Sequence, residues 1–351
     1  MAEMSYAEAI RDGLATALRL DPSVICYGLG VTDPKGVFGT TLGLEAEFGS
    51  DRVFDMPTAE NAMTGIAIGA ALGGLRPVLT HQRLDFALLS MDQIVNNAAK
   101  WRFMFGGSAS APLVIRMILG RGWGQGPTHS QNLHAWFAHI PGLKVVMPTR
   151  PADAKGLLLS AIFGQDPVIF LEQRWLHNAR GETPQGDYRV PIGPSAQLHS
   201  GDDLTVVSSG YLSIEALHAA QFLAANGVGC DLIDLRSLRP LDLPAIRASL
   251  VRTGRLLVLD SGFATGGIAG EILAWASETA FSALKVAPAR LTAPDAPEAT
   301  SPALTEAYHV RAEHIAARAA QMLGVTLDVE PLVSRRRFAH DTPGDWFKGP
   351  F

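Results

Sequence analysis

Apolar and polar residues alternate in two kinds of pattern along the first half of the chain, one helical and one typical of strands. Between residues 5 and 19, Ala7, Ile10, Leu14 and Leu18 recur at helical spacing, which predicts an amphipathic helix. Short apolar runs bounded by Gly or Pro then occur at 24–28, 77–80, 112–117 and 167–172. Runs of this length are typical of strands buried on both faces. We expect a helix at 91–101 among them, and strands that alternate with helices predict a parallel sheet.

The same alternation starts again in the second half of the chain. Strands are expected at 204–209, 230–235 and 255–260, with helices at 213–226, 244–252 and 302–323. The intervening stretch is polar and rich in turn residues, which is typical of a linker. The sequence therefore predicts an α/β protein with two parallel-sheet domains, and 351 residues suffice for two cores. Its expected parts are domains 1–180 and 203–325, a linker at 181–202, and a tail at 326–351 without periodic pattern.

Composition narrows the class of protein. Hydrophobic residues make up 47% and charged residues 18%, and the net charge is −5, which argues against a disordered or nucleic-acid-binding chain. Cys26 and Cys230 lack the spacing of a disulfide framework or zinc site, and a reducing cytoplasm fits. The first residues lack the pattern of a signal peptide, and no run of 18 apolar residues predicts a membrane span.

One stretch combines a strand-to-helix junction with a carboxylate. Residues 52–61 run from a short β pattern through Pro57 to Glu60 and Asn61. The following run, 62–74, is apolar, rich in Gly and Ala, and uncharged, which predicts a helix that packs closely against something. Glu60 is then either an ordinary acidic residue of a first helical turn or a catalytic group.

Two glycine-rich loops follow predicted strands. Gly28 and Gly30 come directly after the strand at 24–28, and ligands usually bind at the carboxyl edge of such sheets. The second loop, residues 120–131, has four glycines in seven residues and then the sequence His129-Ser130-Gln131. It lacks the Lys-Ser/Thr of a phosphate-binding loop. A lone loop histidine is more often structural than catalytic, so the loop alone leaves both interpretations open.

Together these segments resemble a known family. The motif around Glu60, the glycine-rich lead into His129-Ser130-Gln131, and the segments 92–100, 135–148 and 234–242 are similar to the beta subunit of the thiamine-diphosphate-dependent first component of 2-oxo acid dehydrogenases. That subunit belongs to the wider transketolase family. The resemblance covers roughly residues 5–325. It implies a pyrimidine-binding transketolase-like domain followed by a transketolase C-terminal-like domain.

The resemblance also implies roles for particular residues. Glu60 would hydrogen-bond the aminopyrimidine ring of thiamine diphosphate, where a carboxylic acid favours the imino tautomer. Phe86 would pack against the pyrimidine, and His129 would lie over the cofactor as an acid or base. Gly28 and Leu29 would form one wall of the site. The family usually has an acidic residue at position 29, so Leu29 makes this wall less polar than usual.

Two further features bear on the implied site. Relatives carry more apolar residues at 81–83, so His81 and Arg83 either line an altered substrate pocket or have a solvated or structural role. Some relatives bind potassium through backbone carbonyls, and the matching positions here are Ala161, Ile162, Gly164 and Asp166.

The resemblance implies a partner as well. A "GDG…N" segment that binds magnesium and diphosphate does not occur in this sequence. An alpha subunit would therefore supply that half of the site, with its magnesium, in an α2β2 assembly. The expected reaction decarboxylates a 2-oxo acid and passes the acyl group to the lipoyl arm of an acyltransferase.

Two other functions remain open at this point. Leu29 and residues 81–83 are also compatible with a split transketolase-like carboligase, which would transfer a two-carbon or acyl unit to a metabolite acceptor. A non-catalytic regulatory subunit is the third hypothesis. The joint presence of Glu60, Phe86 and His129 argues against it.

Overall fold

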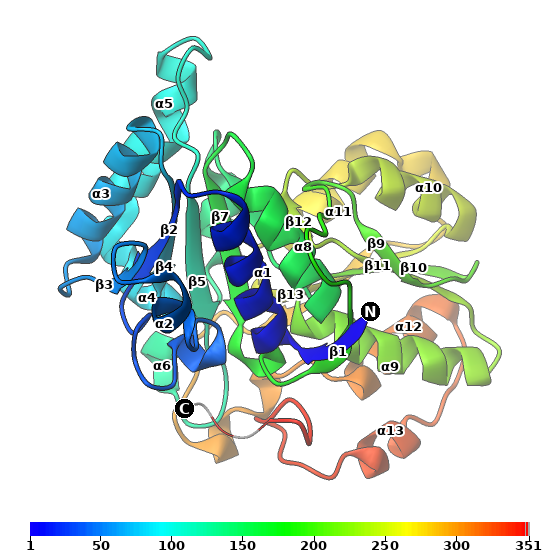
Figure 1. The fold of residues 1–351 in the computed structure, drawn as a ribbon. Coiled ribbons are helices and arrows are strands. Elements are labelled where there is room, and N and C mark those ends of the chain that lie inside the picture. The colour runs from blue at the N-terminus through cyan, green and yellow to red at the C-terminus, as the bar shows by residue number, and fades with distance from the viewer. Residues whose placement is uncertain (348, 350–351) are drawn as a thin grey trace. The chain divides into compact units, whose positions relative to one another are not determined.

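The computed structural model describes residues 1–347 and 349 and divides into two compact units (Figure 1). The first unit contains residues 1–120, 136–192 and Gly349. The second contains residues 121–135 and 193–347. The loop 121–135 thus packs with the second unit, although in sequence it interrupts the first.

The first unit is built on a parallel sheet with the strand order β6-β7-β5-β4-β2-β3. Its strands are β2 (Val24–Gly28), β3 (Val53–Asp55), β4 (Arg76–His81), β5 (Val114–Leu119), β6 (Lys144–Val146) and β7 (Val168–Gln173). Strands β5 and β7 are buried along their whole length, which explains their nearly continuous apolar sequence. A separate antiparallel pair joins β1 (Ala2–Ser5) to β8 (Arg180–Thr183).

Helices cover this sheet. They are α1 (Tyr6–Leu20), α2 (Leu44–Phe48), α3 (Glu60–Leu72), α4 (Leu84–Ala87), a π-helix (Gln93–Ala98), α5 (Ala99–Met104), α7 (His134–His139) and α8 (Pro151–Ile162); 3-10 turns lie at Val37–Gly39, Leu88–Ser90 and Arg174–Leu176. Helix α1 begins with a capping box in which Ser5 Oγ accepts from the Glu8 amide and Glu8 accepts from the Ser5 amide. Its apolar face packs against α8.

The second unit has a five-stranded sheet in the order β14-β13-β10-β11-β9. Its strands are β9 (Ala196–His199), β10 (Leu204–Ser208), β11 (Cys230–Asp234), β13 (Leu256–Phe263) and β14 (Ala289–Ala293). The short strand β12 (Ser237–Arg239) lies among the residues of this unit but is not part of this sheet. Its helices are α6 (Gly126–His129), α9 (Tyr211–Ala225), α10 (Leu243–Thr253), α11 (Ile268–Thr279), α12 (Ala312–Leu323) and α13 (Glu330–Arg335); 3-10 turns lie at Phe281–Ala283, Pro302–Leu304 and Glu306–Tyr308. Leucines and alanines of β10, α9 and α12 form its core.

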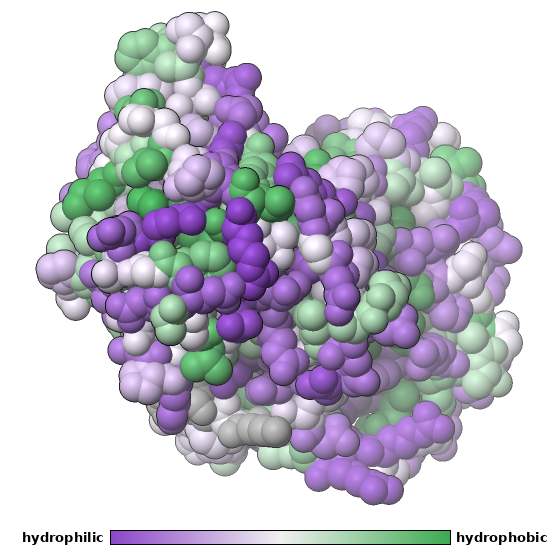
Figure 2. All heavy atoms as spheres, in the orientation of Figure 1, coloured by the Kyte–Doolittle hydropathy of each residue, from purple (hydrophilic) through white to green (hydrophobic). Residues whose placement is uncertain are grey.

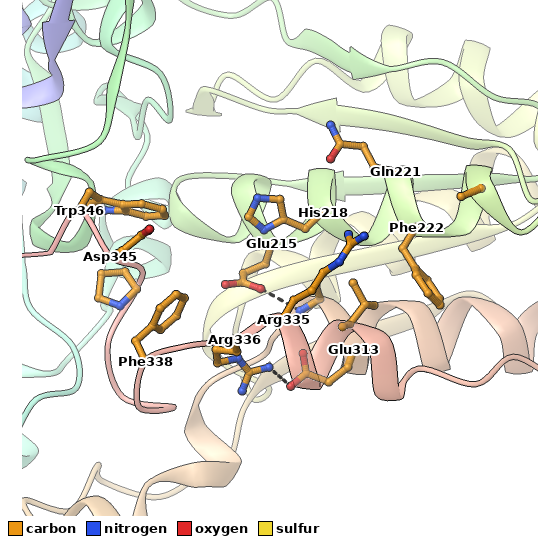
Figure 3. A pocket seen from close by; sticks show the side chains of 14 residues that line it. Glu215, His218, Gln221, Phe222, Glu313, Arg335, Arg336, Phe338, Asp345 and Trp346 are labelled. Atoms are coloured by element: carbon orange, nitrogen blue, oxygen red, sulfur yellow. Dashed lines mark hydrogen bonds and ion pairs between the residues drawn. The ribbon is translucent and has the colours of Figure 1, made fainter.

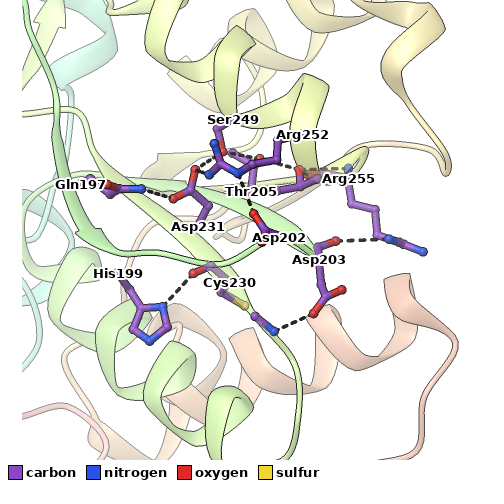
Figure 4. A network of polar contacts seen from close by, with 12 residues as sticks. Gln197, His199, Asp202, Asp203, Thr205, Cys230, Asp231, Ser249, Arg252 and Arg255 are labelled. Carbon is purple, nitrogen blue, oxygen red and sulfur yellow. Dashed lines mark hydrogen bonds and ion pairs between the residues drawn. The ribbon is translucent and has the colours of Figure 1, made fainter.

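A polar network joins α10 to this sheet (Figure 4). Asp231 of β11 accepts hydrogen bonds from Ser249 and Arg252 of α10 and from Gln197 of β9. Arg252 also pairs with Asp202. The buried carboxylate of Asp231 therefore has partners on both sides, as a charged group inside a protein requires.

The structure confirms the predicted fold class, an α/β protein with two mainly parallel sheets. The prediction of one helix from 302 to 323 was wrong. Two 3-10 turns occupy its first part, and α12 begins only after Arg311, whose buried guanidinium bonds to Glu215 and Tyr211. Strands β1, β8, β9, β12 and β14 were not foreseen. Within the part of the chain that the structure describes, no helix has both the length and the apolarity to span a membrane.

The tail packs on its own unit as far as residue 347. Arg311 donates to the carbonyl oxygens of His340 and Thr342, and Tyr211 donates to that of Pro343. Arg336 pairs with Glu313 of α12, and the tail closes a cavity of about 440 Å³ against α9 and α12 (Figure 3). Residues 348, 350 and 351 of the predicted tail lie outside the described residues.

Candidate active site

The carboxyl ends of three neighbouring strands bring two predicted site segments together in the first unit. Strands β2 and β3 end at Gly28 and Asp55, and β4 ends just beyond Thr80. A Cβ at Gly28 would lie 2.2 Å from the Thr80 carbonyl oxygen, so only glycine fits there. The Asp55 carboxylate accepts from the Val31 amide at 2.7 Å. The half-buried Leu29 thus lies in a loop held against the strand that leads to Glu60.

Glu60 is the first residue of α3, and its side chain is only 7% exposed. Its backbone carbonyl accepts from Thr64 Oγ1 at 2.9 Å. Among the described residues, no hydrogen bond or ion pair reaches its carboxylate. The carboxylate oxygens are not fully buried, so a ligand that enters from the sheet edge can reach them and hydrogen-bond to them. This position therefore suits a group that hydrogen-bonds a bound ring.

His81, the last residue of β4, lies close to the first turns of α3. It is fully buried, and its Nε2 lies 3.4 Å from Thr64 Oγ1, one turn along from Glu60. Burial lowers the pKa of His81 to about 4, so the imidazole is neutral at neutral pH. His81 thus packs between β4 and α3 and does not present a charge to a pocket.

Arg83 lies two residues further along, at the same edge of the sheet. Its guanidinium carbon is 5.3 Å from the centroid of the Phe38 ring, and that of Arg174 is 4.8 Å from the same centroid. Both arginines are buried, with 7% and 5% exposure. Burial, followed by the charge of Arg83, lowers the pKa of Arg174 to about 10.

Phe86 lies on α4, immediately after this segment. Its side chain is 36% exposed, unlike the buried Leu84 and Ala87 of the same short helix. Aromatic rings of this kind can offer an apolar face to a planar ring. The exposure of Phe86 fits the contact with the cofactor pyrimidine that the family resemblance implies. This contact remains a prediction.

A fully buried ion pair crosses the middle of the same sheet. Arg116 of β5 donates to both carboxylate oxygens of Glu172 on β7, at 2.6 and 3.0 Å. Arg116 also donates to Thr40 Oγ1 at 2.8 Å and to Thr80 Oγ1 at 3.3 Å. Burial alone would raise the pKa of Glu172, but the charge of Arg116, together with the contacts from His177 and Arg116, outweighs it and lowers this pKa to about 2. The pair therefore stays ionised and fixes the Phe38 loop through Thr40.

His129 lies in the second unit, at the end of α6, and the loop around it is anchored on both sides. Before it, the carboxylate of Glu298 accepts from the Gly122 amide at 2.8 Å and from Arg121 at 3.3 Å. After it, His134 Nε2 lies 2.8 Å from Asp260 Oδ1. Glu298, His134 and Asp260 are all buried. The two contacts hold the His129 loop against the second unit.

Comparison with known proteins places this geometry in a family. Residues 2–178 match the transketolase pyrimidine-binding domain, and residues 193–315 match the transketolase C-terminal domain. The chain belongs to the transketolase family. Within this family it is 42% identical over 327 residues to the acetoin:2,6-dichlorophenolindophenol oxidoreductase subunit beta of Cupriavidus necator, covering 90% of this chain and 96% of that relative.

Other members of the transketolase family give the same picture. The pyruvate dehydrogenase E1 component subunit beta of Staphylococcus epidermidis is 39% identical over 296 residues, covering 84% of this chain and 91% of the relative. A solved structure described as a split gene transketolase, inactive beta4 tetramer, superposes with a TM-score of 0.75 at 21% identity, covering 92% of this chain and 99% of that one. This last likeness shows the fold.

In this transketolase-family chain, two of the backbone carbonyls considered for potassium binding accept hydrogen bonds from a guanidinium group. Arg76 donates to the carbonyl oxygens of Ile162 and Gly164, at 3.0 and 2.9 Å. The Asp166 carboxylate pairs with Arg102 and Lys144. Potassium binding by Ala161, Ile162, Gly164 and Asp166 remains a prediction, and a bound ion would compete with the Arg76 guanidinium for two of these carbonyls.

Sequence reasoning missed several residues that hold the site. Arg116 and Glu172 stand inside the otherwise apolar runs Val114–Leu119 and Val168–Gln173, and two opposite charges in buried strands are a sign of a pair. Glu298 and Asp260 are distant in sequence from the loop they hold, and no local pattern marks them.

Proposed function

We propose that this chain is the beta subunit of a heteromeric enzyme that uses thiamine diphosphate to decarboxylate a 2-oxo acid and transfers the acyl group to a lipoyl acceptor. The observation that carries the proposal is Glu60, a withdrawn carboxyl group at the carboxyl edge of the first sheet. Relatives named as beta subunits of pyruvate dehydrogenase and of an acetoin oxidoreductase support it.

Three residues of the first unit would hold the pyrimidine half of the cofactor. When bound, thiamine diphosphate would supply a nucleophilic carbon and an electron sink for the decarboxylation of a 2-oxo acid. Glu60 would hold a proton toward the ring, and its burial would strengthen that hydrogen bond. Phe86 packs against the ring, and the apolar Leu29 excludes water from its edge.

His129 would move a proton to or from the substrate in the same reaction. An imidazole can donate and accept protons near neutral pH. Glu298 and Asp260 hold its loop at the start and at the end. We infer that these contacts set the position of His129, because a flexible glycine-rich loop would otherwise lose the geometry that proton transfer needs.

The diphosphate, its magnesium and the rest of the site would come from an alpha subunit in an α2β2 assembly. Helix α3 offers a surface for such a partner, since it carries no charge after Glu60 and exposes apolar and small residues on one side. Figure 2 shows hydrophobic side chains exposed over α3 and near the tip of α5. The exposed apolar residues there are Ile66, Leu72, Leu89, Phe103, Met104 and Phe105. Apolar side chains exposed in this number on neighbouring helices are typical of an interaction site.

Cellular location and acceptor belong to the same proposal. Both cysteines are buried thiols, which fits the reducing cytoplasm in which we place the enzyme. The acceptor would be the lipoyl domain of an acyltransferase. A carboligase would leave lipoyl domains unreduced and would join the acyl unit to an aldehyde, so one assay separates the two functions.

The test is reconstitution of this chain with its alpha partner, thiamine diphosphate, magnesium, a 2-oxo acid and a lipoyl domain. We expect reductive acylation of the lipoyl domain, and Glu60→Gln should lower kcat by at least about 100-fold, because proton transfer contributes on that order. Glu45→Gln is the matched control, since Glu45 also lies in the first turn of a helix but is exposed. Full activity of Glu60→Gln would refute the role of Glu60.

A further inference from the structure

The loop that contains His129 includes a residue in an unfavourable backbone conformation. Trp123 has φ of 55°, in the left-handed region that residues other than glycine rarely adopt. It lies in the turn 122–125, in which the Gln125 amide donates to the Gly122 carbonyl at 3.2 Å. This turn leads directly into α6, whose last residue is His129. Strained residues that the surroundings hold in place cluster at functional sites.

The loop rests on the segment that follows β14. Glu298 of that segment anchors the start of the loop, as described above. A Cβ at Gly126, the first residue of α6, would lie 2.7 Å from Thr300 Oγ1, so the loop and the segment are in close contact there. Trp123 is nevertheless 43% exposed. The segment therefore supports the loop but does not enclose the Trp123 ring.

The C-terminal tail supplies a partner for that ring. The Phe347 and Trp123 rings meet edge to face, with their centroids 6.0 Å apart and their planes at 84°. Aromatic pairs favour this arrangement, because the positive edge of one ring faces the negative face of the other. Both residues belong to the second unit. The far end of the chain thus contacts the turn that precedes α6.

Hydrogen bonds hold the tail on the way to this contact. The fully buried Arg311 donates to the carbonyl oxygens of His340 and Thr342. The Phe347 amide then donates to the Gly344 carbonyl at 3.1 Å, which closes a turn at the end of this stretch. A segment that is already ordered loses little further entropy when its last ring docks. The contact between Phe347 and the loop is therefore stronger than one made by a free chain end.

We propose that Phe347 is a positioning residue for His129: its ring retains Trp123, and this contact keeps the turn and α6 where proton transfer needs them. This inference rests on the proposed function, in which His129 moves a proton. A glycine-rich turn has many alternative backbone conformations, and the left-handed Trp123 favours leaving its own. Without Phe347 the loop occupies these alternatives for part of the time, and only the fraction in the competent conformation turns over.

Amide hydrogen exchange on the full chain with its alpha partner tests whether Phe347 holds the loop. Phe347→Ala should speed exchange of the amides at 122–131 about fivefold, the worth of one aromatic pair, and leave those of β10 and β11 unchanged. Phe347→Tyr, which keeps the ring, should restore slow exchange. Phe281→Ala is the matched control, because Phe281 is an exposed phenylalanine elsewhere in the same unit.

Turnover of the reconstituted enzyme with a 2-oxo acid and a lipoyl domain tests whether the contact acts through His129. Phe347→Ala should lower kcat about tenfold with little change in KM, because the geometry of proton transfer is disturbed and substrate binding is not. In a chain that already carries His129→Ala, Phe347→Ala should lower kcat no further, because changes that act through one group are not additive.

The outcomes separate this inference from the proposed function. Unchanged exchange at 122–131 in Phe347→Ala would overturn the inference. So would an unchanged kcat, or a loss of kcat that is equally large in the His129→Ala chain, since the tail would then act on stability alone. Each of these results leaves the role of Glu60 intact. A wild-type enzyme that fails to acylate the lipoyl domain would refute the proposed function, and the exchange rates would still show whether Phe347 holds the loop.

Discussion

Replacing Glu172 by Gln should destabilise the first unit more than any surface change of the same kind. The substitution keeps the shape of the side chain but removes the charge that Arg116 faces inside the sheet. Arg116 would then remain buried with its positive charge uncompensated, although Thr40 and Thr80 would still accept from it. Removing one partner of a buried ion pair lowers the free energy of unfolding by roughly 3–5 kcal/mol.

The pKa of Glu172 gives a second way to calculate how much stability Glu172→Gln should lose. Its value falls from an ordinary 4.5 to about 2 in the folded chain. At about 1.4 kcal/mol per pKa unit, the shift corresponds to about 3 kcal/mol. Because the folded pKa is depressed, this stabilisation is complete above pH 4.5 and is lost as the pH falls towards 2. The difference in stability between wild type and Glu172→Gln should therefore be largest near neutral pH.

Urea denaturation at several pH values measures this difference, with hydrogen exchange of β5 and β7 amides to assign it to the first unit. Glu3→Gln is the matched control, because Glu3 also pairs with an arginine but is exposed, and it should change stability by less than about 0.5 kcal/mol. A loss below about 1 kcal/mol for Glu172→Gln at pH 7, or a difference that grows as the pH falls, would refute the reasoning.

Two further predictions concern the second unit and the partner surface. Glu298→Gln should lower kcat of the reconstituted enzyme by about tenfold with little change in KM, because it weakens the anchor of the His129 loop. The control is Glu306→Gln, on an exposed residue, which should leave kcat unchanged. Equal kcat values for the two variants in stopped-flow acylation would contradict this. Ile66→Glu should abolish co-purification with the alpha subunit, because it places a charge on the apolar side of α3, whereas Leu304→Glu, on an exposed residue of the second unit, should not. Persistence of the complex in Ile66→Glu would exclude α3 from the interface.

The sequence was informative wherever local chemistry decides the structure. Apolar runs bounded by Gly and Pro marked strands such as β5 and β7, and the small-residue run after Glu60 marked α3. The same reasoning failed at 302–311, where α12 begins late because Arg311 bonds to residues nearly one hundred positions away. Edge strands such as β9 carry no run of their own, since pairing with β11 stabilises them.

The candidate site shows the same division between local and distant causes. Motif resemblance pointed to Glu60 and to His129, but it could not show that Arg174 joins Arg83 at the Phe38 ring, because 91 residues of sequence separate the two arginines. Nor could it show what holds His129. The loop 121–135 lies between β5 and α8 in sequence, yet its anchors Glu298 and Asp260 belong to the second unit. Glu60 therefore depends on the first sheet and His129 on the second unit. If His129 moves the proton and Glu60 binds the pyrimidine, as we propose, a substitution confined to the second unit, such as Glu298→Gln, should impair proton transfer while leaving the pyrimidine-binding residues undisturbed.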